Sequence, residues 1–192
     1  GASPGRACSL PVVESDSTVA VEAVLSHLWG LGHRRFDFVS HYLDAPMPHY
    51  AYVRRRDAFV AGLAERGAPA GRVVALPSFD VEAYASEFCA LPAHARPTAI
   101  VASNDGVALK LLAAFAARGV RVPQEVSVTG YDGYPLGQDV FPPLTTWCPN
   151  WGTLGRTAFR CVVERALGND IPSHVLVGGR LEVRGSTGPP AG

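Results

Sequence analysis

The sequence has few cysteines and lacks a long apolar run. Its four cysteines are scattered, with no CxxC pair and no histidine at metal-ligand spacing. This pattern indicates neither a zinc site nor a disulfide framework, and it is typical of free thiols in a reducing cytoplasm. The apolar runs are far shorter than a membrane span, and no secretory signal opens the chain, so we expect no membrane partner.

Charge of one sign is also lacking. The chain carries 17 basic and 17 acidic residues, so its formal net charge is zero. A domain that grips phosphate backbones normally carries a basic excess or a basic face. The one dense basic cluster is Arg54–Arg56, and three arginines on one helix are more often a solvated face. We therefore do not expect this chain itself to grip DNA.

Motifs for catalysis are absent as well. The sequence has no G-x-S-x-G elbow, no P-loop and no G-x-G-x-x-G. His27 and His33 flank a predicted helix end, and nothing supplies a nucleophile with its base and orienting group. A chance Ser/His/Asp grouping stays open, but the sequence predicts neither an enzyme nor a cofactor or metal.

What the sequence does contain is an alternation of strands and helices. Capping residues, glycine stops and apolar periodicity predict helices over 18–29, 50–66, 80–90, about 105–118 and 151–167. Strands are predicted over 36–40, 72–76, 98–102, 126–131 and 144–147, with short ones around Val175 and 181–184. This succession predicts an α/β fold with a doubly wound parallel sheet.

Polar and aromatic side chains follow the predicted strands. Phe79, Asn104 and Asp132 each come just after a strand, and Arg55 lies near the start of a helix. Ligands of open parallel sheets collect at this edge, so we expect these residues to bind a small sugar-like, polyol or nucleobase-like molecule. Simpler roles stay open: Asn104 as a helix cap, Asp132 as a turn residue, Phe79 in the core, and Arg55 in a surface ion pair.

Several segments, in order, carry a family resemblance. Leu31–Arg35 (LGHRR), Ala102–Asp105 (ASND), Val122–Asp132 (VPQEVSVTGYD), Pro142–Thr146 (PPLTT) and Val183–Thr187 (VRGST) resemble elements of LacI/GalR transcription regulators. The resemblance implies a periplasmic-binding-protein-like sensor that closes on an effector and transmits the closure to a DNA-binding headpiece. It places the effector-binding residues of the family at Arg55, Phe79, Asn104 and Asp132. Trp147–Asn150 departs from the family pattern at the crossover.

The resemblance also implies how the chain is organised. Residues 33–147 and 174–187 would form the C-terminal lobe, residues 10–32 and 148–173 remnants of the N-terminal lobe and crossover, and 1–9 and 188–192 tails. The headpiece and most of the first lobe would be absent, so DNA would be bound only through that missing part. Leu25, Leu28, Phe159 and Val163 should then be exposed or covered by another copy.

The resemblance predicts a cytoplasmic homodimer that pairs through the helices starting at Asp80 and Asp105. A different class, the solute-binding protein of a sugar transporter, shares the architecture and stays open as the alternative. That class is not expected to carry the PPLTT crossover or the closing VRxST segment.

Overall fold

The protein is described by a computed structural model that covers residues 11–46, 48–78 and 80–191. Its contacts divide the chain into two units, which we describe separately. The larger unit contains Ser17–Cys148 and Arg180–Gly192, and the smaller contains Gly1–Asp16 and Pro149–Gly179. In the described residues, no helix is long and apolar enough to span a bilayer.

The larger unit is built on a six-stranded sheet with the order β3-β2-β4-β5-β6-β8. Its strands are β2 (Phe36–His41), β3 (Arg72–Leu76), β4 (Ala99–Ala102), β5 (Ser127–Tyr131), β6 (Thr145–Pro149) and β8 (Gly179–Glu182). The pairs β2–β3, β2–β4, β4–β5 and β5–β6 are parallel. The chain winds outward in both directions from β2 and β4, which confirms the predicted doubly wound fold.

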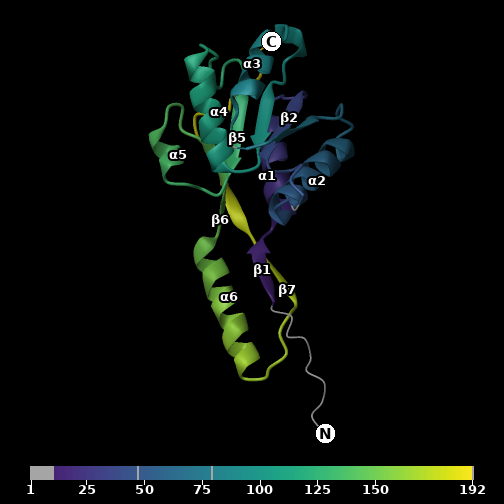
Figure 1. Cartoon of the computed structure of the whole chain (residues 1–192), viewed down its shortest axis with the longest axis vertical. Helices are drawn as coiled ribbons and strands as arrows, with labels where there is room; N and C mark the ends of the chain where they lie inside the picture. The colour runs from purple at the N-terminus through teal and green to yellow at the C-terminus, as the bar shows by residue number, and fades with distance from the viewer. Residues whose placement is uncertain (1–10, 47, 79, 192) are drawn as a thin grey trace. The chain divides into compact units, whose positions relative to one another are not determined.

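Helices cover both faces of this sheet (Figure 1). One face packs against α1 (Ser17–Gly30) and α2 (Tyr50–Glu65), the other against α3 (Glu82–Ala90) and α4 (Asp105–Ala117). Neighbouring residues of β4 point to opposite faces, so Val101 joins the α1–α2 core while Ile100 joins the α3–α4 core. A short helix, α5 (Leu136–Asp139), lies in a segment predicted as a loop.

Helix α1 corrects one sequence expectation. Leu25 and Leu28, predicted to be exposed or covered by another copy, are fully buried within this chain. They pack with α2 and with Phe36 and Phe38 of β2, because the sheet of the larger unit presents an aromatic face to them. The units therefore differ in their bounds from the predicted lobes: α1 groups with the larger unit rather than with residues 148–173.

The smaller unit consists of β1 (Val12–Ser15), β7 (His174–Val177) and α6 (Trp151–Ala166). The two strands are parallel, and Glu14 of β1 lies 2.5 Å from the His174 ring of β7. Phe159 is 71% exposed and Val163 is 37% exposed, so the rest of this chain leaves them open, in agreement with the prediction that they are exposed or covered by another copy.

A buried histidine fixes the segment that follows β8 in the larger unit. The ring of His33 lies 3.0 Å from the Thr98 hydroxyl through Nδ1 and 2.8 Å from the Gly188 carbonyl oxygen through Nε2. Since a carbonyl only accepts, Nε2 carries the hydrogen and Nδ1 accepts from Thr98. Burial lowers the pKa of His33, which keeps the ring neutral in this arrangement.

Candidate binding site at the sheet edge

Three of the four predicted site residues lie at the carboxyl edge of the larger sheet. Arg55 is on α2, Asn104 is the residue before α4, and Asp132 follows β5. Phe79, the fourth, lies outside the described residues. The parallel pairing of β4 with β5 brings the segments that end in Asn104 and Asp132 side by side.

Arg55 contacts the residues at both of these strand ends. Its Nη1 donates to the Ser103 carbonyl oxygen over 2.6 Å, and its Cζ lies 3.3 Å from the centroid of the Tyr131 ring. The side chain is buried, and its Nε has no hydrogen-bond partner among the described residues. The alternative role in a surface ion pair is therefore wrong: Arg55 is a buried cation stacked on an aromatic ring with an N–H still to donate.

Asn104 is a helix cap, as the simpler interpretation held. Its Oδ1 accepts from the Val107 backbone N–H over 2.8 Å at the start of α4. Its Nδ2 donates to the hydroxyl of Tyr52 over 3.1 Å. The cap uses the carbonyl oxygen of the amide, so one amide N–H remains for another acceptor.

Asp132 has both an unusual backbone and an unusual titration. Its φ is 124°, a value that residues with a side chain rarely adopt. The pKa of Asp132 is raised to about 7, chiefly by burial. The Arg55 guanidinium opposes this increase, and the nearby Asp105 carboxyl adds to it. The turn role is therefore present, but a carboxyl that titrates near neutrality is also typical of a functional site.

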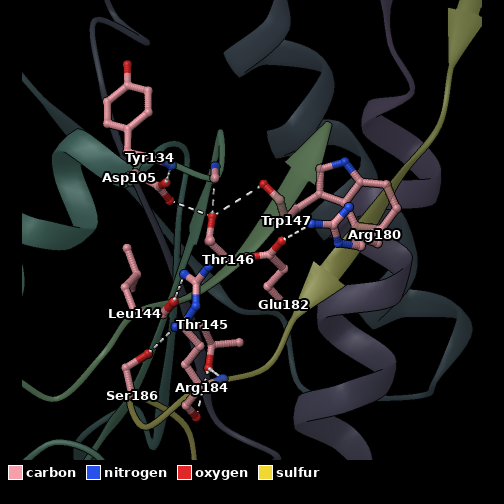
Figure 2. A network of polar contacts seen from close by, with 11 residues as sticks. Asp105, Tyr134, Leu144, Thr145, Thr146, Trp147, Arg180, Glu182, Arg184 and Ser186 are labelled. Atoms are coloured by element: carbon pink, nitrogen blue, oxygen red, sulfur yellow. Dashed lines mark hydrogen bonds and ion pairs between the residues drawn. The ribbon is translucent and has the colours of Figure 1, made fainter. Parts of the chain in front are cut away.

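Asp105 was missed as a site residue. Its fully buried carboxylate accepts from the Thr146 hydroxyl and from the Tyr134 backbone N–H, each over 2.6 Å (Figure 2). Burial raises the pKa of Asp105, while these hydrogen bonds lower it. A Cβ atom on Gly130 would lie 2.2 Å from Asp105 Oδ1, so a residue without a side chain is needed there. The only sequence signal was its position beside Asn104.

Strand β6 is held by a second set of polar contacts, also drawn in Figure 2. Arg184 donates from Nη1 to the Leu144 carbonyl over 2.7 Å and pairs with Glu182. The Thr145 backbone N–H donates to the Ser186 hydroxyl over 2.8 Å. These contacts join β6 to the segment after β8, and they hold Thr146 where its hydroxyl reaches Asp105.

An aromatic cluster beside Arg55 was also missed. We define it as His41, Tyr42, His49, Tyr50 and Tyr52, which lie at the end of β2 and the start of α2. The centroids of contacting rings lie 4.6–5.1 Å apart, and Tyr52 contacts both His41 and His49. The pKa of Tyr134 is raised, chiefly by the nearby charge of Asp132. Burial and the charges of Asp105 and Tyr52 raise it further. The cluster could have been found from the run of rings in the sequence.

Comparison with known proteins now gives the family. The sequence pattern of the periplasmic binding protein-like domain matches residues 25–187. The chain belongs to this family. Its relatives place it in the LacI/GalR group: it is 29% identical over 183 residues to the HTH-type transcriptional repressor CytR of Escherichia coli. That match covers 93% of this chain and 52% of the repressor, so the chain spans about half the length of this relative.

Other relatives agree with the LacI/GalR assignment. The HTH-type transcriptional repressor PurR of Photobacterium profundum is 46% identical over 70 residues, which cover 36% of this chain and 21% of PurR. A LacI transcriptional regulator from Rhodococcus has a TM-score of 0.81 at 26% identity, covering 95% of this chain and 66% of that one. These relatives are regulators, so the alternative of a transporter's solute-binding protein is not favoured.

A hollow in this LacI/GalR domain is lined by Tyr42 of the aromatic cluster but by none of the described predicted site residues. It has a volume of about 710 Å³ and lies beside α3 and α4, lined by Ser78, Lys110 and Arg118 among others. Arg55, Asn104 and Asp132 are not among its lining residues. The buried, unsatisfied donor at Arg55 and the shifted pKa of Asp132 are features of a recognition site, whereas the size of a hollow alone is not.

Proposed function

We propose that this LacI/GalR domain binds a small effector at the carboxyl edge of its larger sheet, through Arg55, Asn104 and Asp132, with Phe79 as a stacking aromatic. The observation that carries the proposal is the buried Arg55 guanidinium, stacked on Tyr131 with an Nε hydrogen still to donate. Leaving a buried donor without an acceptor costs about 1–3 kcal/mol, and a bound effector would remove that cost.

The three side chains offer complementary chemistry. Arg55 and Asn104 each have an N–H left to donate, and Asp132 supplies carboxyl oxygens that accept. Such a set can recognise hydroxyls, carbonyl oxygens or ring nitrogens of a metabolite. It includes no nucleophile activated by a base, which supports a sensor that performs no turnover.

The wider role follows from the family. We infer that the domain acts in the cytoplasm within a transcriptional repressor, where effector binding changes the affinity of a helix-turn-helix headpiece for operator DNA. We also infer a homodimer that pairs through the exposed faces of α3 and α4. Sedimentation that finds only a monomer at micromolar concentration would contradict the dimer without affecting the binding proposal.

Calorimetry tests the binding site. We expect one compound from a panel of sugars, polyols, nucleobases and nucleosides to bind the protein, and we expect its affinity to fall at least about tenfold in Asp132→Ala. Asp139→Ala is the matched control, because Asp139 is an exposed aspartate on the neighbouring α5. If Asp132→Ala and Arg55→Ala both bind the compound normally, the site assignment is wrong.

A further inference from the structure

Tyr52 also makes contacts outside the aromatic cluster, with Asn104 and Arg55. It is half-buried on α2, one helical turn before Arg55, whose Cζ lies 5.7 Å from the centroid of the Tyr52 ring. The ring contacts His41 at 4.6 Å and His49 at 5.1 Å between centroids. The other end of the side chain, its hydroxyl, meets Asn104. Tyr52 therefore joins the aromatic cluster to the proposed effector site.

The hydrogen bonds of Asn104 give the Tyr52 hydroxyl a definite direction. Because Asn104 Oδ1 is occupied by the helix cap, the amide must present its Nδ2 to Tyr52, and the hydroxyl oxygen accepts. The phenolic hydrogen is then left to donate, and no acceptor for it is found among the described residues. A chain of donors thus runs from Asn104 through Tyr52 toward a ligand, and each bond in such a chain polarises the next.

Three groups at this edge have a hydrogen left to donate. They are the Tyr52 hydroxyl, the second Asn104 N–H and Arg55 Nε. Each hydroxyl of a polyol can both donate and accept, whereas a carbonyl oxygen only accepts, so a row of donors suits a carbonyl oxygen. The flat rings around Tyr52 also favour a planar partner, which stacks on them.

We propose that Tyr52 is a specificity-determining residue, whose hydroxyl, oriented by Asn104, donates to a carbonyl oxygen of a planar heterocyclic effector such as a nucleobase or nucleoside. Asn104 is then a positioning residue for Tyr52 as well as a helix cap. This inference rests on the proposed function and names the class of ligand for the same site.

Two nucleosides that differ at the ring carbonyl provide the test. Inosine and nebularine share the ribose and the purine skeleton, but inosine has a C6 carbonyl and an N1–H where nebularine has a C6–H and an unprotonated N1. We expect inosine to bind the protein at least about tenfold tighter than nebularine, as measured by calorimetry. Tyr52→Phe should remove this preference by weakening inosine alone, because the phenyl ring keeps the stacking and lacks the donor. A merely structural effect of the substitution would weaken both nucleosides equally.

Two further variants make the test specific. Tyr50→Phe is the matched control, since Tyr50 is a half-exposed tyrosine on the same helix, and it should keep the preference for inosine. Asn104→Ser retains a good helix cap but removes the N–H that orients Tyr52, so it should reduce the preference even if Tyr52→Phe folds poorly.

The outcomes separate the two proposals. If inosine, uridine and hypoxanthine fail to bind while D-ribose or D-galactose binds, the heterocycle inference is wrong and the proposed function stands. A preference for inosine that persists in Tyr52→Phe also overturns the inference. If no compound of the whole panel binds, the proposed function itself fails.

Discussion

Replacing Asp132 with asparagine should make the fold more stable in alkaline solution while it weakens effector binding. The folded protein holds the Asp132 carboxyl at a pKa of about 7, against 3.8 for the free side chain, chiefly because burial disfavours the charged form. Between these two values the folded state binds a proton that the unfolded chain has already lost. Stability therefore falls as the pH rises toward 7, because the folded state binds more protons than the unfolded state.

The magnitude follows from the same values. Between pH 5 and pH 8 the folded state gives up the Asp132 proton, which would cost at most about 3 kcal/mol at 1.36 kcal/mol per pKa unit. Water reaches part of this side chain, so we expect about 2 kcal/mol. Asparagine is always neutral and has nearly the same shape as aspartate, so the variant should lack this loss.

Urea unfolding followed by circular dichroism at pH 5 and pH 8 measures the effect. The stability advantage of Asp132→Asn over the wild type should be greater at pH 8 than at pH 5 by about 2 kcal/mol. His27, His33 and His41, whose pKa values are lowered mainly by burial, contribute equally to both proteins and cancel in the comparison. If the difference in free energy is the same at both pH values, the Asp132 carboxyl does not titrate near neutrality and the reasoning is refuted.

Three further predictions concern the framework of the site. Thr146→Val removes a charge-assisted hydrogen bond to a buried carboxylate, and urea unfolding at pH 7 should show a loss of about 2 kcal/mol. Gly130→Ala would bring a Cβ atom within 2.2 Å of Asp105 Oδ1, so thermal melting should show a loss of about 3 kcal/mol. Gly155→Ala, inside α6 with open space around it, should instead raise the stability by up to about 1 kcal/mol. The pKa of His33 is lowered, so the wild type should lose stability as the pH falls below about 6.5, and unfolding curves of His33→Gln should depend less on pH in that range. Equal stability of Thr146→Val and the wild type, or parallel pH profiles for His33→Gln, would contradict these accounts.

Much of the fold could be predicted from the sequence because local signals agree with one another there. The apolar run Thr98–Ala102 precedes Asn104, a good cap, and Gly119 follows the helix with a φ of 71°. Each feature has a local cause, so the strand and helix can be placed without knowledge of the rest of the chain. The topology follows because successive βα units favour right-handed crossovers.

The burial of α1 could not be predicted in the same way. An apolar helix face indicates that a partner exists, but it does not say which sheet covers it. The resemblance suggested a sheet outside this chain, whereas Leu25 and Leu28 pack on β2 and α2. The choice depends on side chains such as Phe38 and Phe59, whose common face is set only when the helices dock.

Proximity of three predicted site residues followed from one rule, that strand ends of a parallel sheet share an edge. The contacts that decide the chemistry of these residues could not be predicted from that rule. Asp105 reaches Thr146 across 41 positions of sequence, and Asn104 reaches Tyr52 across 52. Such contacts depend on side-chain directions in the assembled fold, and no spacing in the sequence encodes them.

The amino and carboxyl edges of the larger sheet differ in whether their buried polar groups have hydrogen-bond partners. At the amino edge both ring nitrogens of His33 are paired, with Thr98 and Gly188. At the carboxyl edge Arg55 keeps a buried N–H without an acceptor, and Asp132 combines a positive φ with a carboxyl whose charge opposes folding. Groups that lower stability at one edge of an otherwise satisfied sheet are typical of a site built for a ligand rather than for the fold. The gain in stability expected for Asp132→Asn, together with its loss of binding, would measure that difference directly.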